Sequence, residues 1–224
     1  MMQEQTAPKA GSKRRTKVSV VIPAYNEEKT LGAVLDVLHQ VELIDDILVV
    51  SDGSTDGTVQ VAKEHRARVL ELQPNRGKGG AMQAGVKATF ADVVLFLDAD
   101  LMGLKPEHVR DLLRPVLQGE VDMSVGVFDG GRPITDLSQA MAPYLSGQRA
   151  VRRHVLESLF DLDLSRFGAE VALTRFFKRR GARWAEVALT DMTHVMKEEK
   201  LGLVKGFVAR MKMYWEIAKY LPKD

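Results

Sequence analysis

Two aspartates, Asp98 and Asp100, end the stretch VVLFLDAD at residues 93–100. Carboxylates this close together repel each other and are costly to bury unless a cation or hydrogen-bond donors compensate them. A divalent metal ion with diphosphate oxygens would do so, because Mg²⁺ is typically held by one or two carboxylates plus substrate phosphates. Short Asp-x-Asp strings also occur as turns and helix caps, so the pair alone does not establish a metal site.

A second chemical feature is the glycine-rich stretch NRGKGGAMQAG at residues 75–85, which contains Lys78. A glycine-rich helix start with a lysine suits an anion, because exposed backbone N–H groups and the positive helix end both face it. The stretch is not a P-loop, since Gly79 rather than Ser or Thr follows the lysine. A solvated surface lysine is the alternative interpretation of Lys78.

Short apolar runs alternate with segments of helical periodicity along the first 130 residues, which predicts an α/β fold with a largely parallel central sheet flanked by helices. The expected strands are 17–23, 46–52, 68–72, 92–98 and 121–128, and the expected helices are 31–41, 55–66, 78–90 and 106–118.

Polar residues follow three of these strands, in the sequences PAYNEE, SDGSTDGT and DADLMG. The carboxyl ends of parallel strands meet at one edge of a sheet, and ligands of open α/β sheets bind there. We therefore expect a binding site at this edge.

Four blocks of the sequence, VVIPAYNEEKTL, VVSDGSTDGT, NRGKGGAMQAG and LFLDADL, resemble glycosyltransferase family 2 and its relatives of the GT-A fold. They occur in the order of that family, and the resemblance extends from about Val18 to His194. It implies an enzyme, a hexosyltransferase, that uses a nucleotide-diphosphate sugar and a divalent metal.

The resemblance also implies a set of donor-binding residues, with a UDP-sugar favoured and a GDP-sugar as the second choice. Ser51 stands where many members have a second aspartate, whereas the aspartate that contacts the base is present at the next position. Ordinary turn chemistry is the alternative for that aspartate. The implied donor residues are Pro23, Ala24, Tyr25, Glu27, Asp52, Gly77, Lys78, Gly79 and Asp98.

By the same resemblance, Asp98, Asp100 and His194 form a site for Mg²⁺ or Mn²⁺, with Asp100 also catalytic. Glu170, on a predicted helix at 167–180, is the second catalytic candidate: it would orient a hydroxyl or act as general base in an inverting reaction. The alternatives are a structural histidine at 194 and a favourable negative charge at a helix start for Glu170.

The second half of the chain is expected to bind the acceptor. The region FDGGRPITDLSQAMAPYLSGQRAVRR loosely resembles glucosyl-3-phosphoglycerate synthases. This resemblance assigns Arg132 and Thr135 to an acceptor phosphate or carboxylate, and Ser146 and Gly147 to the sugar pocket. The Ser-Gly pair is expected to form a loop before a basic helix.

Three functions remain open from the sequence. The favoured one is retaining transfer to a small phosphorylated or carboxylated acid. The second is inverting transfer to a polyprenyl phosphate at the membrane surface, and the third is binding of a nucleotide sugar without turnover.

Composition limits the remaining possibilities. The absence of cysteine excludes disulfides and thiolate metal sites and favours a cytoplasmic setting. Five basic residues and one acidic residue lie within the first 17 positions, and the remaining body has no basic excess that would favour nucleic acid.

We predict three regions: a disordered basic tail at 1–16, a GT-A domain at 17–196 with halves 17–128 and 129–196, and an amphipathic C-terminal helix at 197–224. The apolar stripe of that helix would pack on the core, form a homodimer contact or lie at the inner membrane surface as a peripheral anchor. No apolar run approaches the length of about 20 residues that a membrane span needs.

Overall fold

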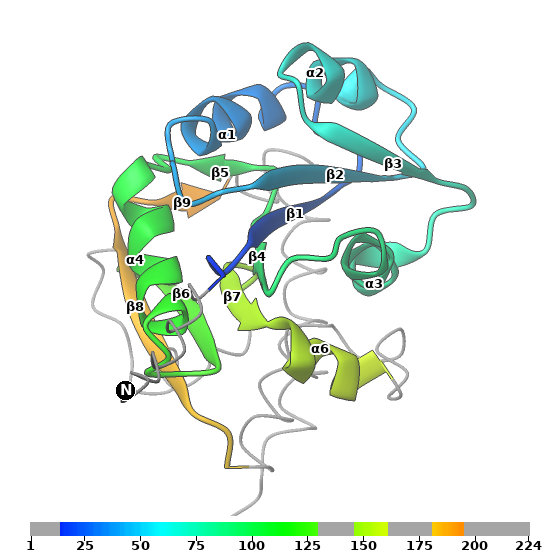
Figure 1. Ribbon diagram of the computed structural model, residues 1–224. Coiled ribbons are helices and arrows are strands. Elements are labelled where there is room, and N and C mark those ends of the chain that lie inside the picture. Colours follow the sequence, from blue (N-terminus) through cyan, green and yellow to red (C-terminus); the bar gives the residue numbers. More distant parts are fainter. Residues whose placement is uncertain (1–13, 130–145, 161–180, 195–224) are drawn as a thin grey trace, which may run out of the picture.

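The computed structural model describes residues 14–129, 146–160 and 181–194, and it confirms the predicted α/β architecture (Figure 1). A seven-stranded sheet has the order β3-β2-β1-β4-β7-β6-β8, and β7 alone among these strands runs antiparallel to its neighbours. Its strands are β1 (Val18–Ala24), β2 (Asp46–Asp52), β3 (Arg68–Leu72), β4 (Val93–Phe96), β6 (Met123–Asp129), β7 (Arg149–Arg152) and β8 (Trp184–Thr190). A separate pair joins β5 (Leu101–Met102) to β9 (Thr193–His194).

Helices cover both faces of the large sheet, as the nearly continuous apolar character of its strands predicts. Side chains alternate along β1, so that Val20 and Ile22 face one core cluster and Val21 faces the other. Figure 1 shows α3 and α6 across the sheet from α1 and α4. The described helices are α1 (Leu31–Leu38), α2 (Thr58–Glu64), α3 (Gly77–Lys87), α4 (Pro106–Leu117) and α6 (Arg153–Phe160).

Helix α3 packs very closely on the sheet through Gly85. A β-carbon at this position would lie 2.4 Å from Val21 Cγ1 and 3.1 Å from Val50 Cγ2. Because these are core side chains of β1 and β2, only a glycine fits without displacing them. This contact sets the height of α3 above the sheet and therefore the position of Lys78 in its first turn.

Several predicted element boundaries differ from the structure by a few residues, and two of the differences have identifiable reasons. Helix α2 begins at Thr58 rather than at residue 55, because residues 53–57 form a turn in which Gly53 has a φ of 75°. A helix follows the loop at Ser146 and Gly147, as predicted, but strand β7 at Arg149–Arg152 lies between this loop and α6.

Strand β7 forms because its side chains pack inside the sheet despite their basic composition. Arg149 is fully buried, and its Nε donates a hydrogen bond to the carbonyl oxygen of Ser146 over 2.9 Å. Ala150 and Val151 are also fully buried. A buried guanidinium with hydrogen-bond partners is tolerated, whereas a surface helix is what the basic residues suggest from sequence alone.

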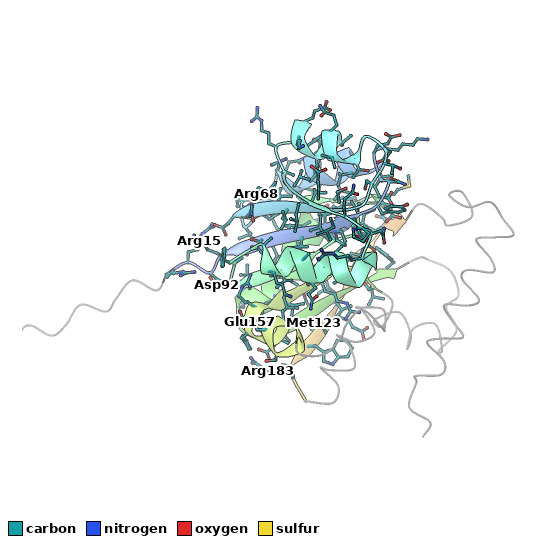
Figure 2. The ribbon with its side chains drawn as sticks, turned by 90° about the vertical axis from the view of Figure 1, so that its right-hand side faces the viewer. Arg15, Arg68, Asp92, Met123, Glu157 and Arg183 are labelled. Atoms are coloured by element: carbon teal, nitrogen blue, oxygen red, sulfur yellow. The ribbon has the colours of Figure 1, made fainter. Side chains whose placement is uncertain are left out.

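Ion pairs join the chain at the amino-terminal ends of the strands, away from the predicted site. Arg68 pairs with Asp46 over 2.7 Å, and Arg15 pairs with Asp45. Asp92 accepts a hydrogen bond from the Lys17 backbone N–H over 2.8 Å, and this bond is the main reason that the Asp92 pKa lies below its ordinary value. Figure 2 shows Arg15, Arg68 and Asp92 at this end of the sheet.

Several predicted features lie outside the described residues, namely Arg132, Thr135, Glu170, most of the basic tail and the C-terminal helix at 197–224. In the part of the chain that the structure describes, no helix has both the length and the apolar character needed to span a bilayer.

Candidate functional site

The carboxyl ends of β2, β1 and β4 lie side by side, as predicted, because these strands are parallel neighbours in the sheet. In the register, Ala24 pairs with Ser51 at the end of β1. The polar sequences that follow the three strands therefore share one edge. This edge brings together the donor candidates from residues 23–27, 52 and 77–79 with Asp98.

The loops after β1 and β2 are joined by hydrogen bonds between them. Asn26 has a φ of 56°, and its side-chain oxygen accepts a bond from the Thr55 backbone N–H over 2.8 Å. The Asn26 N–H donates to Ser54 Oγ over 3.1 Å, and the Glu27 N–H donates to Thr58 Oγ1 over 2.8 Å. Glu27 is thus held in place by α2, and Asn26 and Thr58 are positioning residues that the sequence analysis did not identify.

The carboxylate of Asp56, in the loop after β2, is stabilised in its charged form. Burial alone would raise the pKa of Asp56, but hydrogen bonds from the Thr58 hydroxyl and from the backbone N–H groups of Thr58 and Glu28 lower it to a net value below normal. The Glu28 carboxylate in turn accepts the Gly57 N–H over 2.7 Å. Hydrogen bonds to the carboxylates of Asp56 and Glu28 therefore join the two loops.

Asp52 has a structural role at the end of β2. Its side chain is only 3% exposed, and Oδ1 accepts the Arg76 backbone N–H over 2.7 Å. Its carbonyl oxygen accepts a bond from the Asn75 side-chain amide over 2.7 Å. These contacts fix the loop that leads into α3, so Asp52 has the structural role in a turn that was the alternative interpretation from the sequence. Contact of Asp52 with a nucleotide base stays a prediction.

Tyr25 is 53% exposed at the end of β1, next to the buried Ala24. An exposed aromatic ring above the strand ends offers a flat apolar surface to a planar ligand. Pro23 and Ala24 form the last pairs of β1 with β2. These three residues therefore supply the rigid end of β1 rather than charged groups.

Lys78 and Asp98, predicted for the donor side from two distant motifs, form an ion pair. Lys78 Nζ lies 2.6 Å from Asp98 Oδ1, with side-chain exposures of 39% and 16%. The ammonium group thus shows that the Asp98 carboxylate faces a position that a cation can occupy. Such a pair supports the prediction that α3 and the end of β4 act on the same ligand.

Gly147 and Gln148 also border this ion pair. A β-carbon at Gly147 would lie 2.5 Å from Asp98 Oδ1 and 2.7 Å from Lys78 Nζ. Gln148 Nε2 donates to Asp98 Oδ2 over 3.0 Å. Ser146 and Gly147, predicted for the sugar pocket, therefore adjoin the predicted donor residues, and Gln148 is a further residue of the site that the sequence analysis did not identify.

The backbone of His194 lies beside the second aspartate, because β9 pairs with β5 in the register Leu101 to His194. This pairing is tight: Gly103 has a φ of 75°, and a β-carbon there would lie 2.3 Å from the Asp191 carbonyl oxygen. The His194 side chain lies outside the described part of the structure. Its place in the chain, directly opposite the residue after Asp100, agrees with the predicted metal set.

No group of three or more His, Asp or Glu side chains that could hold a metal occurs among the side chains that the structure describes. Asp98 and Asp100 are the described members of the predicted set. Two carboxylates at an open edge match the way Mg²⁺ is usually held, with substrate phosphates as the remaining ligands. The hard oxygen donors suit Mg²⁺ or Mn²⁺ and do not suit softer ions.

The mostly parallel sheet, the helices on both faces and the carboxylates after β4 define a protein of the GT-A fold, in agreement with its structural neighbours. The chain belongs to glycosyl transferase family 2, whose family model matches residues 19–167.

Individual relatives divide between two acceptor classes. Glucosyl-3-phosphoglycerate synthase of Mycobacterium tuberculosis is 35% identical over 193 residues, covering 70% of this chain and 58% of the synthase. Dolichyl-phosphate beta-glucosyltransferase of Drosophila melanogaster is 42% identical over 111 residues, covering 42% of this chain and 34% of that protein. The chain thus spans less than two thirds of the length of either relative.

Solved structures of the mycobacterial synthase share the fold. The complex with Mn²⁺, UDP and glucosyl-3-phosphoglycerate has a TM-score of 0.68 and 32% identity, and the match covers 80% of this chain and 72% of the synthase. The complex with Mn²⁺, UDP-glucose and phosphoglyceric acid has a TM-score of 0.66.

Proposed function

We propose that this protein is a metal-dependent glycosyltransferase that moves glucose from UDP-glucose to a small phosphorylated acid such as 3-phosphoglycerate. The observation that carries the proposal is the convergence of Lys78, Asp98 and Gly147 at the edge where β1, β2 and β4 end. The synthase relative, which is seen with UDP-glucose and phosphoglyceric acid, supports the choice of donor and acceptor.

A divalent ion fits the residues at this edge. Asp98 and Asp100 would hold the ion together with His194. The Asp98 carboxylate already pairs with one positive group, the Lys78 ammonium, at 2.6 Å. When bound, Mg²⁺ or Mn²⁺ supplies charge neutralisation for the leaving diphosphate. The same relative contains Mn²⁺ in one structure and Mg²⁺ in another, each together with UDP.

The protein's own residues then divide the work of binding. The loops after β1 and β2 provide the rigid surface for the base and ribose, with Tyr25 exposed and Glu27 held by Thr58. Lys78, at the start of α3, would bind diphosphate oxygens, where the positive helix end adds to its charge. Gly147 lets the backbone before β7 approach Asp98 and Lys78 closely, and the sugar would lie beside these groups.

The acceptor segment starts and ends at the same edge. Strand β6 runs parallel to β4 and leaves the sheet at Asp129, and the antiparallel β7 enters at Arg149. Both ends of the segment that contains Arg132 and Thr135 therefore lie toward the edge of the sheet where β4 ends. A guanidinium on this segment would suit an acceptor phosphate or carboxylate.

The proposed stereochemistry is retention. The acceptor hydroxyl attacks the anomeric carbon from the face that the diphosphate leaves, and a leaving phosphate oxygen takes the hydroxyl proton. The anomeric C–O bond to UDP breaks as the new glycosidic bond forms. Glu170 would orient the acceptor in this scheme, because no protein base is then required.

Proton NMR of the anomeric region tests the proposal, with the purified protein, Mn²⁺ or Mg²⁺, UDP-glucose and 3-phosphoglycerate. New α-glucoside signals that require the metal and disappear in Asp100→Asn support it. New β-glucoside signals would overturn retention alone. Metal-dependent binding of UDP without transfer to any acceptor or to water would instead indicate a binding protein.

A second acceptor class has its own supporting observation. The Drosophila relative, which acts on dolichyl phosphate, has the higher identity of the two over the shorter matched region. The same assay with polyprenyl phosphate in vesicles, in place of 3-phosphoglycerate, decides between a lipid and a small acid.

A further inference from the structure

Gln148 is a fully buried amide that connects the predicted sugar pocket to the predicted metal ligand. Its backbone is fixed at two points: the carbonyl oxygen accepts the Gly126 N–H of β6 over 2.8 Å, and its N–H donates to Ser146 Oγ over 3.2 Å. Its side chain is fixed at two more, which leaves the residue no freedom to rotate.

The orientation of the side-chain amide follows from these partners. Ser146 Oγ donates to Gln148 Oε1 over 3.0 Å, and Gln148 Nε2 donates to Asp98 Oδ2 over 3.0 Å. An ionised carboxylate can only accept hydrogen bonds, so the NH₂ side of the amide must face Asp98. The hydroxyl of Ser146, a residue that is only 6% exposed, supplies the donor that stabilises the oxygen side.

The two oxygens of Asp98 consequently have different partners. Oδ2 faces the buried Gln148 amide, whereas Oδ1 faces Lys78, whose side chain is partly exposed. A hydrogen bond to one carboxylate oxygen fixes the rotation of the whole group and so directs the other oxygen. This is the arrangement in which outer partners orient the side chains that hold a metal or its phosphate ligands.

We propose that Gln148 is the positioning residue of Asp98, holding Oδ1 toward the donor diphosphate and its metal through the relay from Ser146 Oγ to Gln148 to Asp98. The inference rests on the proposed function, since it assigns Asp98 to the donor complex. Gln148 itself touches Asp98 rather than the reacting atoms.

Binding of UDP in the presence of Mn²⁺, measured by isothermal titration calorimetry, tests this role without requiring turnover. Electron paramagnetic resonance of free Mn²⁺ gives the metal affinity independently. Gln148→Met keeps the length of the side chain and removes its donor, and we expect about 10-fold weaker binding, the lower end of the range for outer partners of metal ligands. Ser124→Ala is the matched control, because it removes another fully buried side-chain hydrogen bond of the same sheet, from Ser124 Oγ to the Leu112 carbonyl oxygen.

A double-mutant cycle separates positioning from a general structural effect. In the Asp98→Ala background, Gln148→Met should weaken binding no further, because the residue acts through Asp98. Equal losses with and without Asp98 would overturn the inference, as would wild-type affinity in Gln148→Met or in Asp98→Ala. If Gln148→Met does not fold, Ser146→Ala decides instead, since wild-type affinity without the relay hydroxyl contradicts the proposal.

The Asp100→Asn variant distinguishes a failure of the proposed metal site from a failure of the positioning role of Gln148. Loss of Mn²⁺-dependent UDP binding in this variant supports the proposed metal site, whatever Gln148 does. If Asp100→Asn binds like the wild type, the proposed function fails at its metal site. If Asp100→Asn loses binding while the Gln148 variants keep it, only the positioning role fails.

Discussion

Gly147 lies against the carboxylate of Asp98 so closely that a β-carbon would be 2.5 Å from one oxygen and 2.6 Å from the other. Real β-carbons do not approach oxygens to this distance, so any larger residue must move Asp98 or the loop. The absence of a side chain at position 147 is therefore a geometric requirement of the site rather than a requirement for an unusual backbone conformation.

Gly147→Ala should displace the Asp98 carboxylate and reduce kcat/KM by about 100-fold, because misplacement by about 1 Å has effects of this size. Thermal unfolding should change little in comparison. Gly32→Ala is a suitable control, since its β-carbon would meet the end of the His65 side chain at 3.0 Å and make only an ordinary contact with Val61 Cγ1 at 3.6 Å. Full activity in Gly147→Ala would contradict the requirement for a glycine beside the Asp98 carboxylate.

Lys78→Met should weaken UDP binding by about 10- to 100-fold, the range that corresponds to hydrogen bonds to charged groups of roughly 1.5–3 kcal/mol. Titration calorimetry with Mn²⁺ present measures the loss. Lys87→Met, which removes an exposed lysine from the last turn of the same helix, should bind UDP like the wild type. Equal losses in both variants would indicate a nonspecific charge effect.

Gly103→Ala should destabilise the β5–β9 pair and weaken metal-dependent UDP binding, because a β-carbon there would lie 2.3 Å from the Asp191 carbonyl oxygen. Gly181→Ala provides the comparison: Gly181 has a φ of 61° but no neighbour within 4 Å of the added carbon. In both variants the free energy of unfolding should fall by roughly 1–2 kcal/mol, because alanine disfavours the left-handed backbone conformation at these positions. Only Gly103→Ala should lose more stability than this, and only this variant should bind UDP more weakly in the presence of Mn²⁺.

Asp92 should make the stability of the folded protein sensitive to acid pH. Its pKa is lowered in the folded protein, chiefly by the hydrogen bond from Lys17, so it adds stability above its unfolded pKa of about 3.9. That stability is lost as pH falls through the folded pKa. We expect Asp92→Asn to lower Tm at pH 7, with the difference from the wild type shrinking below about pH 4. A difference that stays constant from pH 7 to pH 3 would contradict this explanation.

The parallel half of the fold could be predicted because its strands are covered on both faces. Burial on both sides makes β1, β2 and β4 nearly continuous apolar runs, and the polar residues after them then fall at one edge. The ion pair between Lys78 and Asp98 joins two motifs that the sequence analysis had placed on the same ligand. Here local pattern and tertiary packing agree.

The antiparallel insertion could not be predicted in the same way. Arg149 is a charged residue that the fold buries completely, and the hydrogen bond to Ser146 that makes this tolerable depends on a turn invisible in the sequence. Gln148 carries no chemical signature either, since an amide is neutral and common. Its importance arises only when β7 brings it to Asp98, 50 positions earlier in the chain.

The reversed direction of β7 has a consequence for how this protein can diversify. Because β6 leaves the sheet and β7 returns to it at the same edge, the intervening segment is an insert with both ends on the rigid scaffold. Its length and sequence can change without altering the register of β1, β2 or β4. We therefore expect that replacing residues 130–145, the proposed acceptor segment, with the corresponding segment of a relative would alter the choice of acceptor while the strands that carry the proposed donor site keep their register.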